Sequence, residues 1–427
     1  MYRIYKLIFV ILAVLTGIFF YTQADGEFQN DSDLYCNNML GAGILNINVS
    51  DSVFGLRTYG VDGEEFSKEG GNKEGSILFL LFHAETVEKK DIQLLKIRHQ
   101  QIGIQGWAAY FFGRICDQLT ISGGTSYYLF RLMLAMMFAM VIVAISYSLF
   151  QSYNPVFAVV FYLGSVLSLW VINFSCSSYW VTFTLFLPML VGLAWLKHKN
   201  RIVLFCFLMM LAVALKAGCG YEYMSTVMVS AIIFPIYSTI KMIGKETKIE
   251  TKKNLTKVTA LALACLSGFI TVLLINGYLR ENGDLFKGLH SIYYNDILRR
   301  TYGNAKDYDA ATAPSLNAPL LTVLKLYLVS SKTGRTACLL LIVNFGLFIK
   351  NRRTRSIWAD LILLLCAFAG ALSWLILAKS HSYAHMHINH IVFYIGYMQI
   401  AVYLIIKGIL SVIPIKIVQI QKVLAEK

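Results

Sequence analysis

Long apolar runs alternate with short polar loops along most of the chain. A helix needs about 20 mainly apolar residues to cross the hydrocarbon core of a bilayer. We therefore predict an all-α polytopic membrane protein with about ten transmembrane helices, placed at 5–22, 125–150, 155–172, 179–197, 201–217, 222–241, 257–278, 336–350, 357–378 and 388–409.

The polar stretches between these helices divide the chain into five parts. They are 1–22 (first transmembrane helix), 23–124 (outer loop), 125–278 (helices two to seven), 279–335 (second outer loop) and 336–427 (helices eight to ten with a cytoplasmic tail). In the first loop we expect polar turns, a β-like patch at 44–59 and an amphipathic aromatic helix at 103–119 in the membrane interface. The apolar stretch 318–333 is predicted to be an interfacial or re-entrant helix, and the first helix, which also resembles a signal peptide, is expected to be retained.

Basic clusters orient the predicted helices. They lie at Arg3 and Lys6, at 197–201, at 241–257, at 350–355 and in the tail. Short loops rich in Lys and Arg stay in the cytoplasm, so both termini are placed inside and the two large loops outside. The same clusters account for the net charge of +14 in a chain that is 57% hydrophobic and only 15% charged. A membrane surface explains them, and we expect no nucleic-acid partner.

The turn between the ninth and tenth predicted helices holds four histidines and a lysine. His381 and His385 are four residues apart and would share one face of a helix. Three interpretations stay open: a transition-metal site, although no acid or cysteine joins the cluster; a solvated loop; and a phosphate or pyrophosphate site at the start of the tenth helix. We favour the phosphate site, with Lys379, His381 and His385 as ligands.

Further charged residues lie near the outer ends of the predicted helices. Lys216 and Glu222 bracket a tight turn. Such groups at membrane depth usually face a polar cavity, but Lys216 could also snorkel to the interface and pair with Glu222. Arg131 is either an interface anchor or another cation for the same anion. Arg299 lies among tyrosines and acids in the 279–335 segment, which suits sugar or phosphate contacts and equally an ordinary outer loop.

The first outer loop supplies carboxylates for general-base catalysis. A base must lie within hydrogen-bond reach of the hydroxyl that it deprotonates. Asp25 directly follows the first helix, and Asp51 and Asp62 flank a glycine-containing turn. Each also suits an ordinary turn, so at most one or two of them can be the base.

Three stretches and the order of segments resemble bacterial multi-span glycosyltransferases of the GT-C superfold. The stretches are 101–106, 220–226 and 379–385, and the likeness in architecture covers most of the chain. The resemblance implies a polyprenyl-phosphate-linked sugar donor, a glycan, lipid or protein acceptor at the outer face of a bacterial cell membrane, and an acidic base in the first loop. The family often has two adjacent acids soon after the first helix, where this chain has Asp25-Gly26-Glu27 and, later, Glu64-Glu65.

The expected chemistry is sugar transfer without a required cofactor, although a divalent metal is compatible with it. A first-loop carboxylate would deprotonate the acceptor, and the outer cations would hold the leaving phosphate. Two alternatives stay open. A polysaccharide polymerase or ligase using an undecaprenyl-pyrophosphate-linked glycan would depend on Arg and His, with a dispensable Asp. A transporter or flippase would bury charges at mid-membrane and carry an internal repeat.

Overall fold

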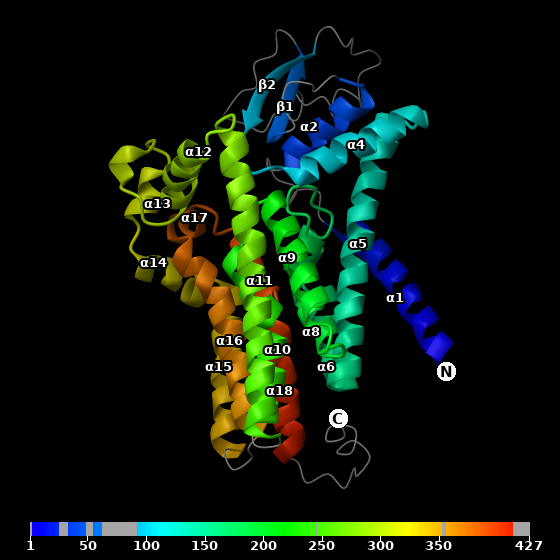
Figure 1. Ribbon diagram of the computed structural model, residues 1–427, viewed down its shortest axis with the longest axis vertical. Helices are drawn as coiled ribbons and strands as arrows, with labels where there is room; N and C mark the ends of the chain where they lie inside the picture. Colours follow the sequence, from blue (N-terminus) through cyan, green and yellow to red (C-terminus); the bar gives the residue numbers. More distant parts are fainter. Residues whose placement is uncertain are drawn as a thin grey trace.

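The fold is nearly all-α, as the sequence predicts. The computed structural model describes residues 2–24, 33–47, 54–61, 92–243, 246–351 and 356–412. Helices make up 79% of the structure, and the described residues hold one antiparallel pair of strands. Figure 1 shows a bundle of long helices with the strands and several short helices gathered at one end.

Six helices in the described ranges are long and apolar enough to cross a membrane. They are α5 (Gly123–Ser152), α9 (Ile202–Cys219), α10 (Met224–Met242), α11 (Lys248–Arg280), α15 (Lys332–Asn351) and α16 (Ser356–Leu377). Shorter apolar helices accompany them: α1 (Tyr2–Gln23), α6 (Pro155–Val166), α8 (Phe183–Trp195), α14 (Leu320–Lys325) and α18 (Tyr397–Val412). The chain is therefore a multi-pass membrane protein, and the total of about ten spans stays a prediction.

Two predicted spans are interrupted in the structure. The 155–172 run forms α6 and then the short α7 (Leu169–Phe174), because the Ser168 hydroxyl accepts a hydrogen bond from the Val171 amide at 3.4 Å and starts a new helix. The 388–409 run begins as a 3₁₀ helix (Asn389–Tyr394). Gly396 then adopts a φ of 105°, which a side chain would strain, and α18 follows it.

Helix α11 is longer than the predicted span, because it begins earlier in the chain. The sequence predicts a loop for the lysine-rich residues before 257, but the helix begins at Lys248. The Thr247 side chain accepts a hydrogen bond from the Glu250 amide, and the Glu250 carboxylate accepts one from the Thr247 amide. This capping box stabilises the first turn and lets the helix extend beyond its apolar part.

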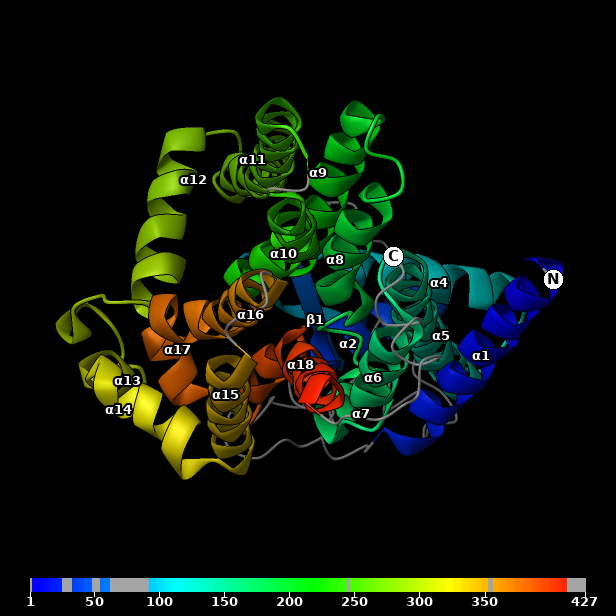
Figure 2. The same ribbon diagram turned by 90° about the horizontal axis from the view of Figure 1, so that it is seen from below.

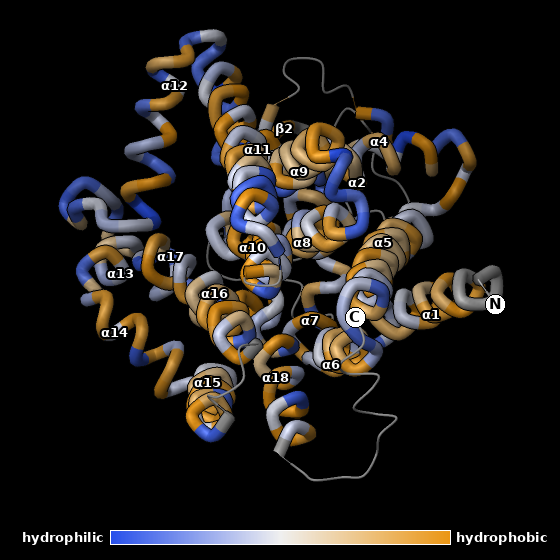
Figure 3. Tube along the Cα trace, turned by 60° about the horizontal axis from the view of Figure 1, so that its bottom comes forward, coloured by the Kyte–Doolittle hydropathy of each residue, from blue (hydrophilic) through white to orange (hydrophobic). Residues whose placement is uncertain are grey.

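Basic loops gather at one end of the bundle, which we call the basic end. There the Lys257 ammonium donates to the Lys199 carbonyl at 2.9 Å, and Lys199 lies 3.4 Å from the Met242 sulfur. Figure 3, with this end turned forward, shows apolar helices whose ends carry hydrophilic residues, as at the α10–α11 connection.

The opposite end, which we call the α4 end, holds the shorter elements. They are α2 (Asp33–Ile44), β1 (Leu56–Val61), β2 (Ile92–Arg98), α4 (Ile104–Gln118), α12 (Leu285–Ile292), a π-helix (Tyr293–Leu298), a 3₁₀ turn (Ala305–Asp307), α13 (Ala313–Asn317) and α17 (Lys379–Ala384). Helix α4 closely matches the predicted 103–119 helix. Within the predicted β-like patch, the first residue belongs to α2, and β1 covers only the last part, paired with β2 from Leu56↔Arg98 to Val61↔Ile92.

The predicted interfacial segment 318–333 forms α14 and a following π-helix (Leu326–Ser330). Figure 2 looks along the long helices and shows α12 and α14 side-on, so both run across the bundle axis. Val323 and Tyr327 point into the protein and are fully buried, whereas Leu321 is exposed. This one-sided burial is typical of a helix lying in a membrane interface.

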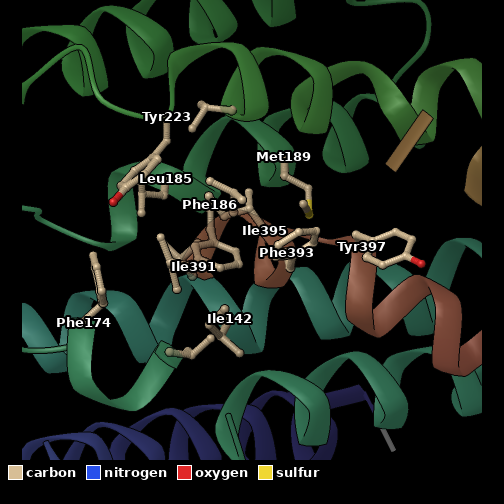
Figure 4. Packing of buried hydrophobic residues seen from close by; sticks show 14 of the residues in the cluster. Ile142, Phe174, Leu185, Phe186, Met189, Tyr223, Ile391, Phe393, Ile395 and Tyr397 are labelled. Carbon is tan, nitrogen blue, oxygen red and sulfur yellow. The ribbon is translucent and has the colours of Figure 1, made fainter. Parts of the chain in front are cut away.

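Aromatic and aliphatic side chains pack the centre of the bundle. Figure 4 shows Ile391, Phe393 and Ile395 among side chains of α5, α7 and α8. The 3₁₀ segment before α18 is thus wedged into the core. This packing holds the segment that follows the histidine turn in a fixed position beneath the α4 end.

Near the basic end, an ion pair between a partly exposed lysine and a buried aspartate joins three helices. The Lys407 ammonium lies 2.6 Å from the Asp360 carboxylate, which also accepts a hydrogen bond from Tyr237 at 2.7 Å. We expect Asp360→Ala to destabilise the protein by about 1–3 kcal/mol, because Lys407 and the buried Tyr237 hydroxyl would both lose their partner. Thermal unfolding in detergent measures this. The double variant Asp360→Leu/Lys407→Met is the control and should stay near wild type; an equal loss in both would show that packing, not charge pairing, is responsible.

Candidate functional site

The start of α4 is fastened to the end of α9. The Gly103 amide donates to the Gly218 carbonyl at 3.0 Å. The Gln105 side chain then donates to the carbonyls of Cys219 at 2.6 Å and Tyr179 at 3.3 Å. These bonds join the 101–106 stretch to the last residues of α9, which directly precede the 220–226 stretch.

The turn between α9 and α10 is shaped by Gly220. Its φ of 156° lies at the edge of the range that favours glycine, and a Cβ there would overlap the Glu222 carboxylate and lie 2.8 Å from the Gln101 Oε1. The Lys216 ammonium donates to the Gly220 carbonyl at 2.7 Å. Tyr223 follows with a φ of 64° and starts α10. The turn therefore points Glu222 inward and closes tightly around it.

Glu222 is a buried carboxylate surrounded by positive charge. It is 3% exposed. The Arg300 guanidinium lies 3.7 Å from its Oε1, and the Tyr179 hydroxyl donates to the same oxygen at 3.4 Å. Burial opposes ionisation of Glu222, but the charges of Arg300 and Lys216 outweigh it and lower the pKa of the carboxyl to about 2. Glu222 is thus ionised at neutral pH.

Other cations surround this centre, and we call the group formed by Arg98, Lys216, Glu222, Arg299 and Arg300 the Glu222 cluster. The Arg98 guanidinium, at the end of β2, lies 5.6 Å from the Tyr179 ring and 5.2 Å from the Tyr35 ring. Arg299 lies near Arg300 and Arg98, and burial and these neighbours lower its pKa. Its buried Nε has no hydrogen-bond partner among the described residues. The buried Asp296 also acts electrostatically on Arg98 and Arg299, but it is paired with Arg280. The four cations therefore exceed the one carboxylate of the cluster, which leaves an excess of positive charge.

Two histidines of the predicted phosphate site border the Glu222 cluster. The His381 ring lies 4.5 Å from the His385 ring and 5.6 Å from Trp374. Burial, together with the nearby Arg300, lowers the pKa of His381 well below its ordinary value, so this ring is neutral at pH 7. Its buried Nδ1 has no partner within the described part of the chain. His385 lies beside it and is exposed. The 379–385 stretch therefore lies next to the Glu222 cluster, where the 101–106 and 220–226 stretches also lie.

Lys379 and Arg131 are placed elsewhere. The Lys379 ammonium donates to the carbonyls of Leu316 and Ala318 at 2.6 and 2.8 Å, so it ties α17 to α13. Arg131 lies over the Tyr127 ring and acts electrostatically on Asp33. Neither has a described contact with Glu222. Of the predicted phosphate ligands, the structure brings together Lys216, Glu222, Arg299, His381 and His385.

Among the described residues of the first loop, Asp33 at the start of α2 is an acid that reaches this region. Its Oδ1 accepts hydrogen bonds from the Tyr179 amide at 2.7 Å, the Ser177 hydroxyl at 2.8 Å and the Ser178 hydroxyl at 3.2 Å. Burial raises its pKa although these bonds oppose the rise. By fixing the 177–179 turn, Asp33 positions the Tyr179 hydroxyl against Glu222.

The three predicted bases lie outside the described residues. These are Asp25, Asp51 and Asp62. In the segment 23–124, the described acids are Asp33 and Asp117. Among the described residues, no three His, Cys, Asp or Glu side chains are grouped so that they could hold a metal ion.

The sequence does not single out Arg98 or Tyr179, whereas Arg300 belongs with Arg299 to the charged residues of the 279–335 segment that suit sugar or phosphate contacts. Arg98 ends a strand whose pairing partner is more than 30 residues away in the chain, and Arg300 adjoins the predicted Arg299. Nothing in the sequence marks Tyr179, which the prediction placed at the start of a transmembrane helix.

Ionisation of Glu222 should make stability depend on pH. Its folded pKa of about 2 lies below the ordinary value of 4.5, so its charge stabilises the fold above pH 4.5 and this contribution is lost as the pH falls towards 2. We expect Glu222→Gln to lose on the order of 3 kcal/mol at pH 7 and to show a smaller deficit at pH 3. Thermal unfolding at both pH values measures the difference.

The matched control is Glu281→Gln, which removes a more exposed carboxylate paired with Lys287 at 3.2 Å. It should change stability by less than about 1 kcal/mol at either pH. A Glu222→Gln deficit that is the same at pH 7 and pH 3 would contradict the charge-based account of this site.

Comparison of the chain with protein-family models, with curated proteins and with solved structures finds no match. The geometry therefore defines the site. It consists of a buried carboxylate, surplus fixed cations and neutral imidazoles, gathered at the α4 end from β2, the 177–179 turn, the α9–α10 turn, Arg299–Arg300 and α17.

Proposed function

We propose that this protein is a membrane glycosyltransferase of GT-C type that moves a sugar from a polyprenyl-phosphate donor to a glycan, lipid or protein acceptor. The α4 end would face the outside of a bacterial cell membrane and the basic end the cytoplasm. One observation carries the proposal: the Glu222 cluster holds surplus positive charge at the end of an apolar helix bundle.

Cations in this position suit a lipid-linked phosphate. Sugar transfer leaves polyprenyl phosphate as an anion, and the charge that develops on its oxygens is stabilised by groups that are already oriented. Glu222 holds Arg300 and Lys216 in place through its charge, and Arg98 and Arg299 lie next to them. Electrostatic attraction is stronger near lipid than in bulk water because the dielectric constant is lower. A metal is compatible with this chemistry but not required by it.

The general base would be a carboxylate of the first outer segment. Glu222 fits this role poorly, because a pKa of about 2 makes it a weak base. Asp33 is better matched, since burial raises its pKa, but its Oδ1 already accepts three hydrogen bonds. Asp25, Asp51 and Asp62 therefore stay candidates from the sequence, and Asp33 joins them.

A polysaccharide polymerase or ligase is the second candidate. It would use an undecaprenyl-pyrophosphate-linked glycan and rely on Arg and His rather than on an acid. The grouping of Arg98, Arg299 and Arg300 with His381 favours it, because a pyrophosphate carries more negative charge than a phosphate. The two candidates differ in whether a first-segment acid is essential.

Transfer assays on the purified protein test the proposal. The donors are radiolabelled polyprenyl-phosphate sugars and an undecaprenyl-pyrophosphate glycan, and membrane extracts supply the acceptors. We expect Arg300→Gln to lower turnover about 100-fold, the effect of removing one fixed charge-stabilising group. One of Asp25→Ala, Asp33→Asn, Asp51→Ala and Asp62→Ala should abolish transfer.

The control is Lys287→Gln, which removes an exposed cation from the same end and should leave transfer unchanged. Normal transfer by a folded Arg300→Gln variant would contradict the proposed site. Transfer from the pyrophosphate donor that survives all four acid variants would establish the polymerase or ligase instead.

Cysteine labelling tests the orientation. His387 is exposed at the α4 end and Asn200 at the basic end, so His387→Cys and Asn200→Cys form a matched pair. In intact cells a membrane-impermeant maleimide should label the cysteine at 387 and not the one at 200, with the unmodified chain as the background. Labelling at 200 with protection at 387 would invert the proposed topology.

A further inference from the structure

Polar atoms without partners gather around Tyr327, beneath the histidine turn. Ser382 Oγ, both polar side-chain atoms of Asn389, and His390 Nε2 are buried and have no hydrogen-bond partner among the described residues. We call Tyr327, Ser382, Asn389 and His390 the Tyr327 cluster. Each unpaired buried atom costs about 1–3 kcal/mol, so several in one place indicate that a molecule outside the chain satisfies them.

Tyr327 holds these residues together. Its hydroxyl donates to the Ser382 carbonyl at 2.8 Å, and its ring lies 4.9 Å from the His390 ring. The Asn389 amide lies beside the Tyr327 hydroxyl without a hydrogen bond of normal geometry. On its other side, His390 stacks on Trp170 at 5.1 Å. The cluster is therefore polar, flanked by aromatic rings, and free of charged members.

The tautomer of His390 follows from its contacts. Its Nδ1 lies 2.9 Å from the Met386 carbonyl, which can only accept, so Nδ1 carries the proton. Its Nε2 is then a bare acceptor that needs an O–H or N–H donor.

These groups favour hydroxyls over phosphate. The oxygens of an ionised phosphate can only accept hydrogen bonds, so they would be repelled by the lone pair of His390 Nε2. The Tyr327 cluster contains no cation that would offset this repulsion. A hydroxyl both donates and accepts, so it can satisfy Nε2, the Asn389 amide and Ser382.

The Tyr327 cluster adjoins the Glu222 cluster. Tyr223 directly follows Glu222 and is electrostatically close to Tyr327 as well. The Tyr223 ring lies 5.4 Å from the Trp374 ring, and the Trp374 ring lies 5.6 Å from the His381 ring. The fully buried Tyr223 hydroxyl has no partner within the described ranges. A charged cluster and a neutral, hydroxyl-seeking cluster thus stand on either side of Tyr223.

We propose that the Tyr327 cluster binds the sugar ring of the lipid-linked donor while the Glu222 cluster holds its phosphate. This inference rests on the proposed function and adds a residue-level site for sugar recognition. It predicts that contacts to Asn389 and His390, rather than to the cations, decide whether the protein distinguishes a glycosylated carrier from a bare one.

Binding measurements on the full-length protein in nanodiscs test the inference. The probes are undecaprenyl phosphate and the same carrier bearing a hexose, a pentose or an N-acetylhexosamine. We expect the wild type to bind at least one glycosylated carrier about tenfold more tightly than the bare carrier, as one or two neutral hydrogen bonds would provide. Asn389→Leu and His390→Phe should lose this preference and keep the affinity for the bare carrier.

The control is His387→Phe, an exposed histidine of the same turn, which should keep the preference. His390→Phe retains an aromatic ring for stacking, so its effect reports the ring nitrogens, and thermal unfolding checks that each variant is folded. If the wild type binds the bare carrier without preferring any sugar, or if both variants keep the preference, the Tyr327 cluster holds ordered water only. If the wild type binds none of the probes, the proposed function fails, and this inference with it.

Discussion

A carboxylate in an apolar interior keeps its charge only where fixed cations surround it, and Glu222 is such a group. Its partners come from parts of the chain that are far apart: Lys216 from the end of α9, Arg300 from the segment after α12, and Tyr179 from the turn before α8. Removing Lys216 or Arg300 would leave the buried carboxylate with less compensating charge, which is unfavourable. The α4 end is therefore held as one unit by charge as well as by apolar packing, and its cations are oriented before any ligand arrives.

The α4 end holds two neighbouring clusters that differ in charge. The Glu222 cluster has surplus positive charge and suits an anion, whereas the Tyr327 cluster is neutral and suits hydroxyl groups. Tyr223, in a left-handed conformation at the start of α10, stands between them. A molecule with a phosphate next to a sugar presents both kinds of group in the same order. The apolar helices beneath would accommodate an attached lipid chain, because they already expose apolar side chains to their surroundings.

Much of the helical architecture could be predicted from the sequence, and parts of the site could not. Long apolar runs with basic ends are a local signal, so α5, α9, α10 and α16 fall close to their predicted bounds. Breaks at Ser168 and Gly396 depend on single capping or left-handed residues, which a hydropathy pattern does not register. Lys216, Glu222, His381 and His385 are ionisable groups near the ends of apolar helices, and Arg299 lies among tyrosines and acids in the outer 279–335 segment, so the sequence marks all five. Arg98 lies in the same site because β2 pairs with a strand far away in the chain. Lys379 lies outside the site because its ammonium donates hydrogen bonds to two backbone carbonyls. Such contacts are tertiary, and spacing along the chain does not reveal them.

A structure of the protein with undecaprenyl phosphate bound tests the central claim most directly. The claim is that the Glu222 cluster is a phosphate site at the mouth of the bundle. It predicts a phosphate density within hydrogen-bond distance of Arg300 and of at least one of Arg98 and Arg299, with the lipid chain running along the apolar helices. A phosphate bound at the basic end, with Arg300 still turned to Glu222 and the α4 end unoccupied, would contradict it.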